Sequence, residues 1–185
     1  MNILEHPHTL QWTILILSLL VLSYAAWKIK NEPDAYEQSN KFTSLGLYTL
    51  KIPPWWGESK KTKSYLQYER LDTYYEWAAS FEHLDKNSEE LNEETLNQIV
   101  SELKIEFDQG FEIERFQYDN ITVIRHEGMG SENNIKRVYM DVAIVFNEKH
   151  NKYIRAISRS SVLNGCVEGP YFEKVLSNIS LKSLS

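Results

Sequence analysis

Two adjacent tryptophans and three lysines form the most conspicuous group of side chains with the chemistry of a binding site. Trp55 and Trp56 follow two prolines, and Lys60, Lys61 and Lys63 come shortly after them. Aromatic rings beside cations are typical of residues that carry most of the binding energy of a protein interface. The same composition suits contact with a membrane surface. In a third interpretation, at least one indole ring fills the end of the hydrophobic core.

Histidine and glutamate adjoin each other at two places, Glu82-His83 and His126-Glu127, which raises the question of a metal site. Zinc requires three or four converging N, O or S ligands. Successive residues of a strand point to opposite faces, so at most one residue of each pair can face a shared ion. The chain also has neither an H-x-x-x-H pair nor a second cysteine beside Cys166. We expect no metal and no other cofactor.

The sequence also lacks the motifs of common catalytic sites. It contains no G-x-S-x-G elbow and no glycine-rich phosphate loop, and it has only seven glycines. The acidic run Glu89–Glu94 lacks the ligand order of a calcium loop and fits the solvated start of a helix better. We therefore expect a protein without catalytic residues, which is not an enzyme.

The charge of the chain argues against nucleic acid as a partner. The formal net charge is −6 at pH 7, and 18 Lys or Arg residues face 25 Asp or Glu residues beyond residue 30. A protein that binds phosphate backbones needs a basic surface. The single cysteine, Cys166, excludes an internal disulfide.

The N-terminal part of the chain holds its longest apolar stretch. Residues 9–27 carry no charged side chain. A helix of this length reaches roughly 28 Å, close to the apolar thickness of a bilayer. Trp12, Tyr24 and Trp27 stand near its ends, where amphipathic rings favour the headgroup level. The stretch predicts a single transmembrane helix in contact with membrane lipid, after a tail at residues 1–8.

A cleaved signal peptide is the alternative, because residues 23–25 (Ser-Tyr-Ala) offer a small-x-small cleavage site. Signal peptides begin with cations, whereas residues 1–8 hold one acid and no Lys or Arg, so we favour an uncleaved anchor. Lys28 and Lys30 follow the stretch directly, and the positive-inside rule therefore favours a cytoplasmic-side domain. Export of the domain is the open alternative.

The rest of the chain predicts a linker and one domain. Residues 28–43 are polar, contain Pro33 and show no period, which is typical of a linker. Residues 44–185 are enough for one domain with a core. Alternating apolar positions predict strands at residues 45–52, 64–71, 73–83, 111–118, 121–128, 135–146 and 153–162, with a hairpin turn at residues 119–120.

Two helices complete the expected domain. An apolar stripe of helical period predicts a helix that Asn92 caps and Gly110 ends, and a second, short helix opens at Gly169. Residues 135–146 are apolar on both faces, which predicts a central strand. Connections between successive strands are too short for parallel crossovers. The expected fold class is α+β: an antiparallel sheet of about six to seven strands flanked by two main helices.

This order of elements resembles the PsbP-like fold. The opening strand ends in I-P-P-W-W at residues 52–56, and the chain closes with G-P-Y-F-E-K-V-L-S-N-I-S-L at residues 169–181. The fold occurs in extrinsic subunits of photosystem II, in Ran-binding Mog proteins and in uncharacterised bacterial secreted proteins. The resemblance covers about 140 residues, residues 44–185 in essence. It implies a non-catalytic module that docks on a larger assembly, and it implies no catalytic residue.

The sequence as a whole predicts a membrane-anchored, non-catalytic binding or assembly subunit with a protein partner. Its candidate interaction residues are those of the tryptophan–lysine group described first. Two alternatives remain open. One is an enzyme with an unrecognised site, such as a cleft lined by His83 or His126. The other is a carrier of lipid or another small ligand, which needs a large apolar cavity.

Overall fold

The structure of the protein is a computed structural model that describes residues 7–70, 76–86, 91–133 and 136–182. The elements, in chain order, are α1 (Pro7–Ser39), β1 (Lys41–Leu45), β2 (Tyr48–Ile52), β3 (Trp56–Lys61), β4 (Tyr65–Arg70), β5 (Trp77–Asp85), α2 (Glu93–Glu102), β6 (Ile105–Phe107), β7 (Ile113–Tyr118), β8 (Ile121–Glu132), β9 (Lys136–Phe146), β10 (Lys152–Ser160), α3 (Val162–Ser177) and β11 (Ser180–Leu181). Parts of two predicted features, residues 73–75 of a strand and Glu89 and Glu90 of the acidic run, lie outside the described residues.

The chain divides into two units, residues 1–40 and 41–185. The first consists largely of α1, a helix of 33 residues. The helix continues to Ser39, through most of the predicted linker at residues 28–43, and Pro33 does not end it. The first strand, β1, begins at Lys41, still within the predicted linker. Across the part of the chain that the structure describes, no helix is both long and apolar enough to cross a membrane, and the predicted span at residues 9–27 is unconfirmed.

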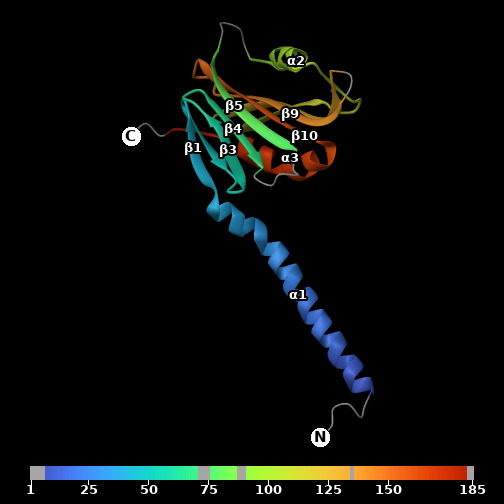
Figure 1. Ribbon diagram of the computed structural model, residues 1–185. Helices are drawn as coiled ribbons and strands as arrows, with labels where there is room; N and C mark the ends of the chain where they lie inside the picture. The colour runs from blue at the N-terminus through green and yellow to red at the C-terminus, as the bar shows by residue number, and fades with distance from the viewer. Residues whose placement is uncertain (1–6, 71–75, 87–90, 134–135, 183–185) are drawn as a thin grey trace. The chain divides into compact units, whose positions relative to one another are not determined.

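The second unit is an α+β domain with two antiparallel sheets (Figure 1). The larger sheet has eight strands in the order β3-β4-β5-β10-β9-β8-β6, with β7 also paired to β8, and the smaller has the order β1-β2-β11. Every strand pair is antiparallel, as the short connections predict. The predicted central position of residues 135–146 is confirmed, because β9 lies between β8 and β10.

The prediction of six to seven strands is wrong, because the described residues form eleven. Residues 45–52, predicted as one strand, are a turn and parts of two strands, because Gly46 has φ +58° and the chain reverses there. Residues from Trp56 to Lys61, which lie between two of the predicted strands, form β3. The remaining difference comes from β6 and β11, which are too short to show an alternation of their own.

The two helices of the domain cover opposite faces of the larger sheet (Figure 1). Asn92 caps α2 as predicted: its side chain accepts the Thr95 backbone N–H at 3.1 Å. This helix ends at Glu102, earlier than predicted, and Lys104 with φ +54° leads into β6. The helix α3 begins at Val162, earlier than the predicted Gly169.

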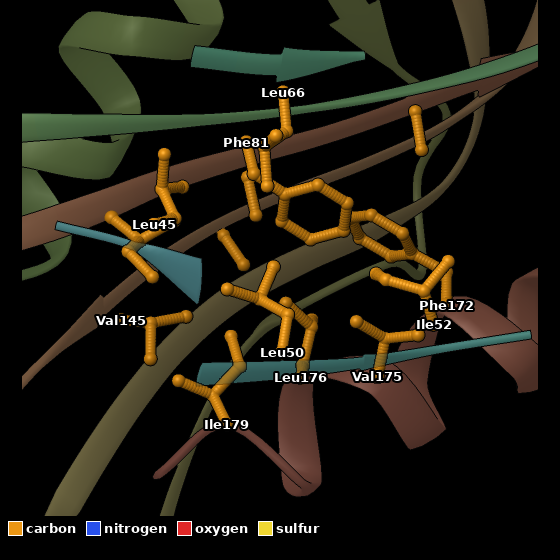
Figure 2. Packing of buried hydrophobic residues seen from close by; sticks show 14 of the residues in the cluster. Leu45, Leu50, Ile52, Leu66, Phe81, Val145, Phe172, Val175, Leu176 and Ile179 are labelled. Atoms are coloured by element: carbon orange, nitrogen blue, oxygen red, sulfur yellow. The ribbon is translucent and has the colours of Figure 1, made fainter. Parts of the chain in front are cut away.

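Each face of the larger sheet has its own hydrophobic core. One core lies between the sheet and α2 and contains Leu96, Ile99, Val142 and Ile144. The other lies between the sheet, α3 and the smaller sheet (Figure 2). Its fully buried side chains include those of Leu45, Tyr48, Leu50, Leu66, Phe81, Ile154 and Phe172. The strand β9 therefore separates two cores, which explains its apolar residues on both faces.

Candidate functional site

The two tryptophans of the predicted interaction site lie in different environments. Trp56 opens β3 and is only 3% exposed. Its ring centroid lies 4.4 Å from that of Trp77 and 6.1 Å from that of Tyr68. Trp56 is thus a core residue, as in the third interpretation of the sequence, in which an indole ring fills the end of the core. Its ring is not available to a partner. Trp55 is only half-buried.

A buried carboxylate of α3 holds both indoles. Glu168 is 0% exposed, and its Oε2 accepts the Nε1–H of Trp56 at 3.0 Å and that of Trp55 at 3.5 Å. Its Oε1 accepts Nη1–H of Arg70 at 2.6 Å. A buried charge is strongly destabilising unless it has such partners. This tryptophan–glutamate cluster therefore fixes the connection between β2 and β3 on α3.

The exposed side of this cluster is rigid as well. The ring of Trp55 packs edge-on against Tyr171 of α3, with 4.7 Å between centroids and 79° between planes. Edge-to-face pairs of this kind add about 0.5–1.5 kcal/mol beyond the burial of their area. Trp55 thus presents a fixed, half-buried aromatic surface at the start of β3.

The three predicted lysines lie at the other end of β3, on the protein surface. Lys60, Lys61 and Lys63 are exposed. The Lys61 ammonium pairs with Glu58 at 3.1 Å, and the Lys60 ammonium lies 5.2 Å from the centre of the Tyr65 ring. Pairs at exposed positions contribute little to stability, so these lysines are not needed for the fold.

The lysines belong to a basic region within an acidic protein. Residues 41–70 contain six Lys or Arg and two Asp or Glu, whereas residues 71–185 contain twelve and twenty. The first region spans β1 to β4. The predicted lysines therefore lie in a segment of the domain whose net charge is opposite to that of the rest.

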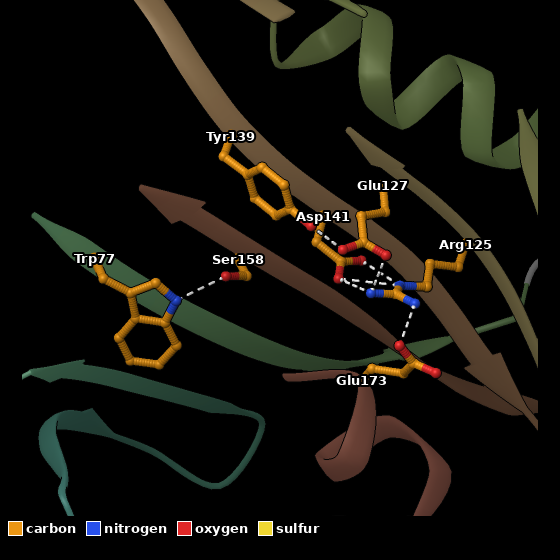
Figure 3. A network of polar contacts seen from close by, with 7 residues as sticks. All are labelled: Trp77, Arg125, Glu127, Tyr139, Asp141, Ser158 and Glu173. Atoms are coloured by element: carbon orange, nitrogen blue, oxygen red, sulfur yellow. Dashed lines mark hydrogen bonds and ion pairs between the residues drawn. The ribbon is translucent and has the colours of Figure 1, made fainter. Parts of the chain in front are cut away.

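A second polar cluster, which the sequence did not predict, lies between the larger sheet and α3 (Figure 3). Arg125 of β8 is 2% exposed and binds Asp141 of β9 through Nε at 3.0 Å and Nη2 at 2.6 Å. Its guanidinium also pairs with Glu127 at 2.5 Å and with Glu173 of α3 at 3.2 Å. The Tyr139 hydroxyl donates a hydrogen bond to Glu127. We call these five residues the Arg125 network.

Three carboxylates share one cation in the Arg125 network, and burial shifts the pKa of two of them, Asp141 and Glu127. Burial raises the pKa of Asp141 from 3.8 to about 7, although the hydrogen bonds and charge of Arg125 oppose the shift. Burial likewise raises the pKa of Glu127, against the charge of Arg125. Burial disfavours the charge of Arg125 itself, but Asp141 and the neighbouring acids raise its pKa above the ordinary value. Arg125 therefore stays a cation that ties β8, β9 and α3 together.

His83 and His126, which were considered for a metal site, each pack against an aromatic side chain. His126 stacks on Phe107 with 3.8 Å between centroids, and its Nε2 lies 3.2 Å from the Phe111 carbonyl oxygen. His83 packs against Tyr48 and fills the space beside Gly46. Within the described ranges, no three His, Cys, Asp or Glu side chains are grouped so that they could hold a metal ion. Burial lowers the pKa of both histidines.

One surface hollow near the end of the domain has a volume of about 440 Å³. It lies between the β7–β8 turn and the residues that follow α3. Its lining is mostly polar, which suits a lipid tail poorly. The lining residues are Tyr118, Asp119, Asn120, Ile121, Ser177, Asn178, Ile179, Ser180 and Leu181.

The positions of the two buried carboxylates, Asp141 and Glu168, could be noticed in the sequence. Asp141 is the one acid in the apolar part of the strand at residues 135–146, and Glu168 precedes the predicted closing helix. A charged residue in a strand that is apolar on both faces must find a buried partner. The partner's identity depends on strand register: Asp141 lies opposite Glu127, and Arg125 lies two residues before Glu127.

Comparison with known proteins identifies the fold. No model of a protein family matches the sequence, and no curated protein matches it. Among solved structures, the Ran-binding protein Mog1p of Saccharomyces cerevisiae matches with a TM-score of 0.54 and 11% identity, over 77% of this chain and 95% of Mog1p. PsbP of the cyanobacterium Synechocystis matches with a TM-score of 0.54 and 11% identity, over 77% of this chain and 92% of PsbP. The chain has the fold that Mog1p and PsbP share, so the predicted resemblance is confirmed.

Proposed function

We propose that this protein is a non-catalytic binding or assembly subunit, which docks on a protein partner through the basic region around β3. The observation that carries the proposal is the exposure of Lys60, Lys61 and Lys63 in a segment whose charge is opposite to that of the rest of the domain. Complementary charge speeds encounter and selects partners more than it adds affinity. The Ran-binding protein Mog1p has the same fold, and its name supports a binding role.

Trp55 has a defined place in this proposal. Its ring is half-buried and held by Tyr171 and Glu168, so little conformational entropy is lost when a partner covers its exposed part. Trp55 also packs against the core cluster to which the buried Trp56 belongs. The expected interface combines one rigid aromatic surface with a rim of lysines.

We further propose that α1 anchors the protein in a membrane through residues 9–27, with the domain on the cytoplasmic side. Support comes from the apolar side chains between Trp12 and Trp27, which are exposed on the helix, and from Lys28 and Lys30 directly after them. Extraction of membranes with alkaline carbonate tests the anchor, because an anchored chain stays in the pellet. The exposed Cys166 reports the side of the membrane, since a cytoplasmic thiol reacts with an impermeant maleimide only after permeabilisation.

Crosslinking in living cells tests the binding role. We expect the full chain to give a defined crosslinked partner that the double variant Lys60→Glu/Lys61→Glu loses. The control Lys104→Glu/Lys149→Glu makes the same change of charge at two other exposed positions and should keep the partner. Equal crosslinking by both double variants, or substrate turnover that depends on one polar side chain, would overturn the proposal.

A further inference from the structure

The strand β3 is an unpaired edge of the larger sheet. In the part of the chain that the structure describes, β3 pairs with β4 on one side and with no strand on the other. Its outer side therefore presents backbone N–H and C=O groups that another strand can bind. Extended segments of partner proteins bind to such edges by adding a strand to the sheet.

The charges along this edge indicate which strand fits. Lys60 and Lys63 have no carboxylate within ion-pair distance among the described residues, whereas Lys61 is paired with Glu58. A second copy of β3 that pairs with this edge at Lys60 and Lys61 would bring lysines against lysines, and like charges directly opposite each other are destabilising. The lysines that oppose self-association would attract a strand that carries glutamate or aspartate.

A bulge limits how far a strand can pair with this edge. The register of β3 against β4 shifts between Glu58 and Lys60, and Ser59 is the extra residue. A bulge bends a strand and increases its twist. The bulge therefore divides the edge into two short stretches, Trp56–Glu58 and Lys60–Lys61, and Lys63 lies in the turn that follows the second.

We infer that the Lys60–Lys61 end of β3 receives a short, extended, acidic segment of a partner protein as an additional strand, with its carboxylates against Lys60 and against Lys63 in the turn that follows. This inference rests on the proposed function and names the class of partner segment. Main-chain hydrogen bonds supply the pairing, and the lysines select an acidic strand over a neutral or basic one.

A synthetic peptide tests the inference. The probe is a fluorescent ten-residue peptide in which glutamate and threonine alternate, and binding to the full chain in mild detergent is followed by fluorescence anisotropy. We expect saturable binding that weakens with salt. Lys60→Glu/Lys61→Glu should weaken it about tenfold or more, while Lys104→Glu/Lys149→Glu changes it less than twofold. No binding of the probe, or equal effects of the two double variants, overturns the inference.

Two methylated peptides separate strand addition from charge attraction alone. Successive amides of a strand point to opposite sides, so N-methylation of every second residue blocks one edge of the peptide and leaves the other intact. We expect one of the two alternate methylation patterns to abolish binding and the other to preserve it. If both patterns bind equally, and phosphatidylserine vesicles displace the probe, the lysines face an anionic membrane and strand addition is wrong.

The outcomes distinguish this inference from the function on which it rests. Loss of the cellular crosslink in Lys60→Glu/Lys61→Glu together with equal binding of both methylated peptides contradicts strand addition and leaves the binding role standing. Retention of the crosslink in that variant contradicts both.

Discussion

Trp56 donates its indole N–H to the buried carboxylate of Glu168, 3.0 Å away and 112 residues later in the chain. This bond joins the start of β3 to the middle of α3. It holds in the core a residue that the sequence predicts for an interface. The position of Trp56 in the core, and of Trp55 half outside it, leads to different expectations for the two rings.

Replacement of Trp56 by alanine should destabilise the domain. The ring contacts Trp77 and Tyr68 in the core, and removal of a buried tryptophan leaves a cavity that costs about 3–5 kcal/mol. The free energy of unfolding, measured with urea, should fall by about this amount. Trp55→Ala is the matched control and should cost clearly less, because that ring is half-buried. Equal losses for the two variants would contradict the assignment of Trp56 to the core.

Replacement of Glu168 by alanine should also destabilise the domain, although it removes only a small volume. The change deprives two indole N–H groups of their shared acceptor, and Trp56 keeps its own nitrogen buried. Breaking a buried pair from one side costs about 3–5 kcal/mol. Glu168→Gln retains an oxygen acceptor and should lose less stability. If alanine and glutamine are equivalent in urea unfolding, the carboxylate does not hold the cluster together.

Replacement of Gly165 by alanine tests how closely α3 approaches β9. A Cβ atom at this position would lie 2.2 Å from Cγ of Tyr139, so the tyrosine or the helix must move. Overpacking of this kind costs about 1–3 kcal/mol, which outweighs the gain of about 1 kcal/mol in helix propensity. Thermal unfolding should show a lower midpoint than for the wild type. The neighbouring Cys166→Ala, at an exposed position, should leave the midpoint almost unchanged. A stabilised Gly165→Ala variant would show that Tyr139 relaxes at little cost.

Most of the larger sheet could be predicted from the pattern of apolar residues. In β10 every second residue is buried, and in β9 nearly all residues are buried. The hairpin at residues 119–120 was predictable too, since aspartate tolerates the φ of +50° that Asp119 adopts. The turn at Gly46 was not, because apolar residues on both sides of it continue one alternating pattern. Short strands such as β11 depend on tertiary contacts and leave no local pattern.

The candidate site was predictable only in part, for a related reason. The exposure of the three lysines could be expected, because the sequence shows no partner that would hold them in the core. All three are exposed in the structure. The division of the Trp55-Trp56 pair into one core and one half-buried ring follows from the packing of Trp56 against Trp77 and Tyr68, which the local sequence does not show. The Arg125 network likewise depends on the register of β8 against β9, which sequence periodicity does not fix between distant strands.

The Arg125 network should make stability depend on pH in an unusual direction. Burial raises the pKa of Asp141 from 3.8 in the unfolded chain to about 7 in the folded protein. Between these two values the folded state holds a proton that the unfolded state has released. The free energy of unfolding must therefore fall as pH rises through this window, by at most about 1.4 kcal/mol per pH unit for one group. The raised pKa of Glu127 acts in the same direction.

The variant Asp141→Asn isolates this contribution, because asparagine keeps the shape of the side chain and does not titrate. Its free energy of unfolding should fall less steeply than that of the wild type as pH rises from 3.8 toward 7, because position 141 then releases no proton when the chain unfolds. Asp108→Asn is the control with the opposite sign: its hydrogen bond from Arg137 lowers the pKa of Asp108, so the wild-type contribution is present above the unfolded pKa and is lost as pH falls. Urea unfolding at a series of pH values measures all three slopes. Identical slopes for the wild type and Asp141→Asn would mean that Arg125 keeps Asp141 ionised despite its burial, and that the network is a charged pair at every pH in this range.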